Sequence, residues 1–328
     1  MIDYTIYYKD VIHPNEPFAN KYDLFVSAFN LSERVQHVFS YSKAKDKWWL
    51  VHPEYEYARE KYHNEKYYDY KNYNEAFFIK HFFKQLECDV KKLNLCIDIT
   101  GFMRPHLMFL IRYLLSIKVS AFDIIYSEPE RYQKDEQTKF SEGAFTGVRQ
   151  VAGYEGQHNP ETHNDLLIIG TGYDTELISN IAESKNNSKK IQLFGLPSLR
   201  PHMYQENVLN ASYAAEAIGS SQADELIHFY SPANDPFITA QALNDKVKTE
   251  QKKRDLSNLY LSPLGTKVQT LGFALYYIHQ CINTNTSMIF PFRNKYSQET
   301  SKGISRIWRY RIELNDLCPS YFNQSTPH

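Results

Sequence analysis

Short apolar runs alternate along this chain with segments of helical period. Each run is about four to seven residues long and is followed by a loop containing Gly, Pro, Ser or Asn. This rhythm predicts βα units and a mostly parallel sheet, because parallel strands need helical crossovers and are buried on both faces. We therefore expect an α/β protein of Rossmann-like build.

The expected elements fall into two halves of similar rhythm. Strands are expected at residues 23–29, 47–51, 95–100, 122–126, 165–169, 190–194, 225–230, 258–261 and 288–290. Helices are expected at residues 32–42, 74–86, 105–117, 175–184, 204–218, 236–254 and 268–282. We predict an N-terminal Rossmann-like half at 1–132, a linker or hinge at 133–164 with a strand at 148–152, and a C-terminal Rossmann-like half at 165–328.

Two segments depart from the rhythm. Residues 55–73 are rich in Tyr and charge, which predicts an insertion that forms either a partner-binding surface or a locally packed subdomain. Residues 304–314 alternate apolar side chains with Arg306, Arg309 and Arg311, which predicts an edge strand with a basic face.

The charge balance and the apolar runs exclude two classes of binding partner, duplex nucleic acid in general and the membrane. Lys+Arg number 37 and Asp+Glu 38, a net charge of -1, so the chain has no overall basic field for general binding of duplex nucleic acid. No basic segment followed by an apolar one begins the chain, and no apolar run reaches the roughly 18 residues of a membrane span. We expect no membrane contact and a cytoplasmic location.

The cysteines and histidines lack the spacings of metal ligands. No CxxC pair occurs, so we expect reduced structural thiols. The histidines considered as ligands have no HxxxH or HxH spacing and no nearby Cys, which predicts no metal site. They are His158, His163, His202, His228 and His279.

Polar loops follow three expected strands of the second half and lead directly into helices. In doubly wound sheets, ligands sit outside the carboxyl ends of the strands, beside helix N-termini. Residues 170–174 begin like a dinucleotide-binding motif, but Thr175 stands where that motif has its third glycine. The alternative to ligand contact is that these residues form only a tight capped turn between strand and helix. The predicted ligand-binding residues are Gly170, Gly172, Asp174, Ser231, Asn234, Ser262, Gly265, Thr266 and Lys267.

The loop Gly265-Thr266-Lys267 combines a free backbone, a hydroxyl and a cation at a helix start, which are the groups that a phosphate needs. With the βα rhythm, it resembles the ligand loop of CARF and SAVED sensor domains, which bind cyclic or linear oligonucleotides in prokaryotic antiviral defence. The resemblance implies a nucleotide-sensing or nucleotide-binding Rossmannoid module with a phosphorylated ligand. It also implies a separate effector protein, because the chain shows no nuclease motif. No other cofactor is identified.

Two further functions stay open. Asp98 lies in an apolar strand, where a carboxylate is costly unless it is paired, and Arg104 and His106 follow it. Either Asp98 or Asp235 would be the general base of a nucleotide-processing or nucleoside-processing enzyme. Alternatively, the chain is a structural adaptor subunit that docks onto a partner through residues 55–73 and 304–314.

Overall fold

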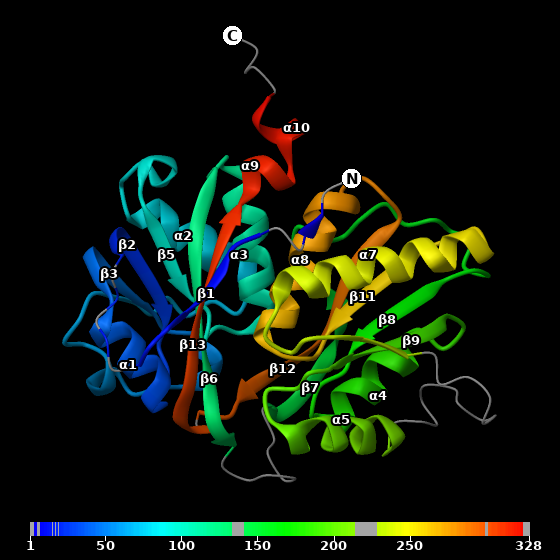
Figure 1. Cartoon of the computed structure of the whole chain (residues 1–328), viewed down its shortest axis with the longest axis horizontal. Helices are drawn as coiled ribbons and strands as arrows, with labels where there is room; N and C mark the ends of the chain where they lie inside the picture. Colours follow the sequence, from blue (N-terminus) through cyan, green and yellow to red (C-terminus); the bar gives the residue numbers. More distant parts are fainter. Residues whose placement is uncertain are drawn as a thin grey trace. The chain divides into compact units, whose positions relative to one another are not determined.

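The computed structural model describes residues 3–4, 7–14, 16, 18, 20–132, 141–213, 228–298 and 301–323. Three predicted segments extend outside these residues, at 133–140 of the linker, 214–218 of a helix and 225–227 of a strand. The chain forms two compact units, unit 1 (Met1–Thr5, Gly143–Asn294) and unit 2 (Ile6–Glu142, Lys295–His328). Each contains a mostly parallel sheet flanked by helices (Figure 1), which confirms the predicted α/β class.

Unit 1 is built on a sheet of order β10-β9-β8-β11-β12-β7. Its strands are β7 (Ser141–Gln150), β8 (Leu166–Gly170), β9 (Lys189–Gly195), β10 (His228–Ser231), β11 (Leu259–Pro263) and β12 (Thr286–Tyr296). Strands β8 to β12 run parallel. Helices α4 (Thr175–Ser184) and α5 (Pro201–Tyr213) cover one face, and α7 (Pro236–Lys253) and α8 (Lys267–Gln280) cover the other (Figure 1).

Unit 2 is built on a sheet of order β1-β13-β6-β5-β2-β3-β4. Its strands are β1 (Lys9–Ile12), β2 (Lys21–Ala28), β3 (Lys43–Leu50), β4 (Tyr67–Tyr68), β5 (Leu95–Asp98), β6 (Ala121–Tyr132) and β13 (Ser301–Glu313). Its longer helices are α1 (Glu33–Tyr41) on one face and α2 (Glu75–Gln85) and α3 (Arg104–Ser116) on the other. Two short helices, α9 (Leu314–Leu317) and α10 (Pro319–Phe322), follow β13.

The five parallel strands have the same spatial order in both units. Numbered along the chain within each unit, they stand in the order third, second, first, fourth, fifth. The order reverses between β8 and β11 in unit 1 and between β2 and β5 in unit 2. Ligands of doubly wound sheets bind at this reversal, outside the carboxyl ends of the strands. Each unit therefore has one such reversal point among its described strands.

Long-range pairing explains where the structure departs from the sequence predictions. The prediction that residues 304–314 form an edge strand is wrong, because β13 lies between β6 and β1, antiparallel to both. This pairing assigns residues 295–328 to unit 2, and residues 143–164 belong to unit 1. Within the Tyr-rich segment 55–73, β4 extends the sheet beside β3, and Tyr62 and Tyr68 are buried.

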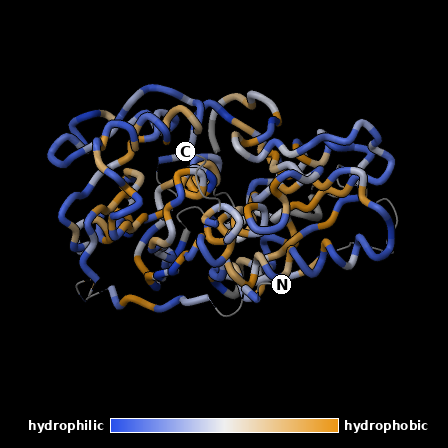
Figure 2. The backbone as a smooth tube through the Cα atoms, turned by 90° about the horizontal axis from the view of Figure 1, so that it is seen from above, coloured by the Kyte–Doolittle hydropathy of each residue, from blue (hydrophilic) through white to orange (hydrophobic). Residues whose placement is uncertain are grey.

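The core of each unit consists of its central strands and the apolar faces of its helices. In β8, residues Leu166 to Ile169 are all fully buried. Helix α8 is buried continuously from Val268 to Ile278, as expected for a helix that is apolar on every side. Figure 2 shows hydrophobic stretches alternating with hydrophilic ones along the backbone. No helix among the described residues combines the length and apolarity needed to cross a bilayer.

Candidate functional site

The three loops predicted to bind a ligand leave the same edge of the unit 1 sheet. Parallel register pairs Gly170 at the end of β8 with Pro263 of β11, and Ser231 at the end of β10 with Gly195 of β9. The hydroxyl of Thr266 also donates a hydrogen bond of 2.6 Å to the carbonyl oxygen of Ala233. The structure therefore brings the loops after β8, β10 and β11 together at the carboxyl edge.

The glycines of these loops make room for neighbouring parts of the protein. A Cβ atom at Gly172 would overlap the carbonyl oxygen of Leu264, and one at Gly265 would overlap the amide oxygen of Gln269. A Cβ at Gly170 would stand 3.1 Å from the ring of Phe273. At Gly172 the close approach of backbone is thus a sufficient reason for glycine, independent of any ligand, whereas at Gly170 and Gly265 the neighbouring atom belongs to a side chain.

The two aspartates of the loops cap helices. Asp174 Oδ1 accepts a hydrogen bond from the backbone N–H of Leu177 at 3.3 Å, at the start of α4. Asp235 is buried, and its Oδ1 accepts from the N–H groups of Phe237 and Ile238 at the start of α7, both at 3.0 Å. A carboxylate at a helix N-terminus offsets the positive end of the dipole. A phosphate at α4 or α7 would therefore meet a negative charge.

Helix α8 begins differently. Its N-cap, Thr266, is neutral and forms a capping box with Gln269, with the Gln269 N–H donating to Thr266 Oγ1 at 3.1 Å. The half-buried Lys267 is the first helical residue, and the first turn contains no acidic side chain. Of the three helices that begin at the described loops, α8 is the one whose start presents an uncompensated dipole together with a cation.

The remaining predicted residues flank this helix start. The Ser231 hydroxyl lies 3.0 Å from the Thr239 hydroxyl and accepts a 3.3 Å hydrogen bond from the Gln269 amide. The Ser262 hydroxyl is buried and has no hydrogen-bond partner among the described residues. Asn234 is half-buried in the loop after β10. Through its contacts with Thr239 and Gln269, Ser231 has a structural role in joining β10, α7 and α8.

An aromatic group at β9, β10 and α5 lies outside the predicted site residues. The rings of Tyr204 and Tyr230 lie 6.2 Å apart, with their hydroxyl oxygens separated by 3.3 Å. His228 and Phe194 pack against Tyr230 at 5.2 and 6.4 Å between ring centroids. Tyr230 is 39% exposed and immediately precedes Ser231. The sequence feature that could have indicated this group is the run of three aromatic residues, His228, Phe229 and Tyr230, at the end of a strand.

Asp98 lies in unit 2, at the end of β5 beside β2. It is fully buried, accepts a hydrogen bond from Ser27 Oγ at 2.9 Å and accepts another from the backbone N–H of Thr100 at 2.9 Å. The register pairs Ser27 directly with Asp98. These contacts satisfy the carboxylate within the sheet, and they place Asp98 at the reversal point of unit 2.

Comparison with known proteins assigns no family. No family model matches the chain, and no curated protein matches its sequence. One similar solved structure is the Acinetobacter baumannii Cap4 SAVED/CARF-domain containing receptor with the cyclic trinucleotide 3'3'3'-cAAA, with a TM-score of 0.33 and 12% identity. The match covers 85% of this chain and 50% of that receptor, so the chain spans about half the receptor's length. At this TM-score the similarity establishes no function for the chain.

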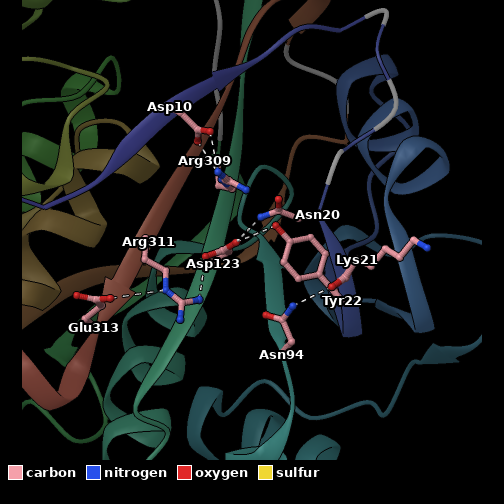
Figure 3. Close-up of polar contacts among 9 residues, drawn as sticks. All are labelled: Asp10, Asn20, Lys21, Tyr22, Asn94, Asp123, Arg309, Arg311 and Glu313. Atoms are coloured by element: carbon pink, nitrogen blue, oxygen red, sulfur yellow. Dashed lines mark hydrogen bonds and ion pairs between the residues drawn. The ribbon is translucent and has the colours of Figure 1, made fainter.

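The arginines expected to form a docking face are held within unit 2 (Figure 3). Arg309 donates two hydrogen bonds to Asp10, at 2.9 and 2.7 Å, which join β13 to β1. Arg311 Nη1 donates to the buried Asp123 at 3.1 Å, and Asp123 also accepts from the Tyr22 hydroxyl at 2.8 Å. Burial, together with the nearby Asp123 carboxylate, raises the pKa of Tyr22. Two of the three arginines thus join strands of the sheet.

Proposed function

We propose that unit 1 is a nucleotide-binding, sensor-type module that takes the phosphate of its ligand at the N-terminus of α8. The observation that carries this proposal is the contrast between helix starts. Asp174 and Asp235 compensate α4 and α7, whereas α8 begins with a neutral threonine and Lys267 at the reversal point of the sheet. An anion is stabilised where dipole and cation act together.

The aromatic group at Tyr204 and Tyr230 supports a nucleotide rather than inorganic phosphate as the ligand. Partly exposed rings stack on bases irrespective of base identity, and such stacking is worth about 1–3 kcal/mol per base. Both rings belong to elements that border the carboxyl edge, since Tyr230 precedes the last residue of β10 and Tyr204 lies in the first turn of α5. A ligand with several phosphates and bases would use both features.

The resemblance of the Gly265-Thr266-Lys267 loop to CARF and SAVED domains makes cyclic or linear oligonucleotides the class to test first. In this proposal the chain acts with a separate effector in antiviral defence, and ligand binding is its own contribution. The enzyme alternative has less support, because Asp98 and Asp235 both accept hydrogen bonds from groups of their own unit.

Calorimetric titration with cyclic and linear oligoadenylates tests the proposal, with inorganic phosphate as a reference ligand. Lys267→Ala is expected to weaken oligonucleotide binding by about 10- to 100-fold, the value of one charge-assisted hydrogen bond. Lys252→Ala is the matched control, because Lys252 is exposed in the last turn of the neighbouring helix α7. Equal affinities of these two variants, or no binding of any oligonucleotide to the wild-type chain, would refute the proposal.

A further inference from the structure

Three potential metal ligands gather at the carboxyl edge of unit 2. His52 follows β3, Glu54 lies in the short 3-10 helix Pro53–Tyr55, and His106 lies in the first turn of α3. One ligand atom from each residue lies within 4.8 Å of the others. All three side chains are buried, with exposed fractions of 0% for His52, 4% for Glu54 and 2% for His106. Neither His52 nor His106 has a histidine at ligand spacing in the sequence.

One oxygen of the Glu54 carboxylate has no hydrogen-bond partner among the described residues. This atom, Oε2, is buried. A second buried carboxyl group, that of Glu75, is close enough to add repulsion to a negative charge on Glu54. A buried carboxylate is costly unless it is paired, hydrogen-bonded or bound to a metal ion. A divalent cation beside Glu54 would offset both the burial and the repulsion.

The imidazoles are held in an aromatic enclosure. The rings of His52 and His106 lie 4.4 Å apart, and Phe78 lies 5.3 Å from each of them. Phe102 packs edge-on against His52 at 5.5 Å. Phe78 and Phe102 are both fully buried. Such walls restrict ring rotation and exclude water, which favours a compact ion with nitrogen ligands.

We propose that His52, Glu54 and His106 form a site for a divalent transition-metal ion, with Zn²⁺ the ion that matches two imidazoles and one carboxylate. Tetrahedral Zn²⁺ holds its ligand atoms about 3.4 Å apart, given bonds of about 2.0–2.1 Å, so binding draws the three side chains slightly together. Because β3 and β5 stand on either side of β2, the ion joins the two loops that border the end of β2.

Metal content of the purified full chain, followed by Zn²⁺ and Co²⁺ titration after chelator treatment, tests the site. The wild-type chain is expected to bind one equivalent, with Co²⁺ giving the visible absorption bands of a low-coordinate nitrogen and oxygen site. Loss of one residue that hydrogen-bonds to a metal ligand lowers metal affinity by about 10- to 100-fold. Glu54→Gln removes a ligand itself, so its metal affinity is expected to fall by at least about 100-fold. Glu56→Gln is the matched control, because Glu56 is exposed two residues away.

Circular dichroism of Glu54→Gln separates a folded variant without metal from a variant that does not fold. If the variant does not fold, the metal content and the Zn²⁺ and Co²⁺ titrations of the wild-type chain decide whether the site exists. The proposal is overturned if the wild-type chain binds neither ion, or if folded Glu54→Gln and Glu56→Gln bind with equal affinity. The oligonucleotide titration of unit 1 is a separate readout, so either result there leaves this test unaffected.

Discussion

Gly172 and Leu264 come into contact through their backbones, at the point where the loops after β8 and β11 meet. A side chain at Gly172 would overlap the Leu264 carbonyl oxygen, and backbone cannot yield as a flexible side chain can. Gly172→Ala is therefore expected to lower the free energy of unfolding by about 1–3 kcal/mol, the usual range for overpacking. Urea denaturation measures this change.

Gly195→Ala is the graded control for that substitution, because its new methyl group would stand 3.1 Å from the Ala233 Cβ, a small side-chain atom. A smaller loss of stability is expected for this variant. An equal or larger loss in Gly195→Ala would mean that the contact of Gly172 with Leu264 does not determine how tightly the loops pack.

The Thr266 hydroxyl both caps α8 and donates to the loop after β10. Thr266→Ala removes both hydrogen bonds and is expected to cost about 1–2 kcal/mol of unfolding free energy. Thr266→Ser keeps the hydroxyl and should retain most of the stability. Thermal unfolding of the two variants provides the comparison, and equal melting temperatures would contradict the assigned role of the hydroxyl.

Glu250 is fully buried on α7 among three lysines, at 2.9 Å from Lys189, 3.4 Å from Lys253 and 3.5 Å from Lys246. Burial raises the pKa of Glu250, but the hydrogen bond from Lys189 and the three positive charges outweigh it, so the pKa lies below its usual value. The resulting stabilisation is present above the unfolded-state pKa and is lost as the pH falls through the lower folded-state value.

Glu250→Gln is expected to lower the free energy of unfolding by about 1–3 kcal/mol at pH 7. This is less than the loss from breaking a fully buried ion pair, because the lysines reach solvent. The difference from wild type should shrink when denaturation is repeated at about pH 3, below the carboxyl pKa values of unfolded chains. Glu183→Gln, at an exposed position of α4, serves as the control. A difference that does not change with pH would exclude the charge as its source.

His279 should make unit 1 sensitive to acid. Burial, reinforced by the positive charge of Lys248, lowers the pKa of His279 from 6.5 to about 4. Between these values the unfolded chain binds more protons than the folded one, so the free energy of unfolding falls as the pH drops from about 6.5 to 4. Replacing this histidine by phenylalanine, which can still pack against Tyr4, should flatten that part of the profile. His163→Gln, at an exposed position, should leave the slope unchanged.

Local signals in the sequence were sufficient for most elements. The expected strand at residues 165–169 corresponds to β8 (Leu166–Gly170), and the helix expected at 236–254 corresponds to α7 (Pro236–Lys253). A fully apolar run and an Asp-Pro helix start each depend only on neighbouring residues. The partners of β13 could not be predicted in this way, because the β1 strand Lys9–Ile12 is short and partly polar and lies almost a whole chain length away.

The sequence predicted which loops lie at the carboxyl edge of the unit 1 sheet, but not what their side chains contact. Strand ends and helix starts are readable from the sequence, and the structure brings these loops together at one edge. The internal contacts of Gly172 and the capping of α7 by Asp235 depend on side chains and backbone that meet only after folding. The same holds for His52 and His106, whose proximity comes from two separate loops.

The path of the chain also sets an order for biosynthesis. Strand β6 is made before the whole of segment Gly143–Asn294, but its neighbour β13 is made after it. Strands β7 to β12 follow one another without interruption, so unit 1 can complete its sheet during translation while one edge of β6 still lacks a partner. An open edge invites pairing with other chains. In unit 2, therefore, the edge of β6 that pairs with β13 stays open until the last strand of the chain has been made.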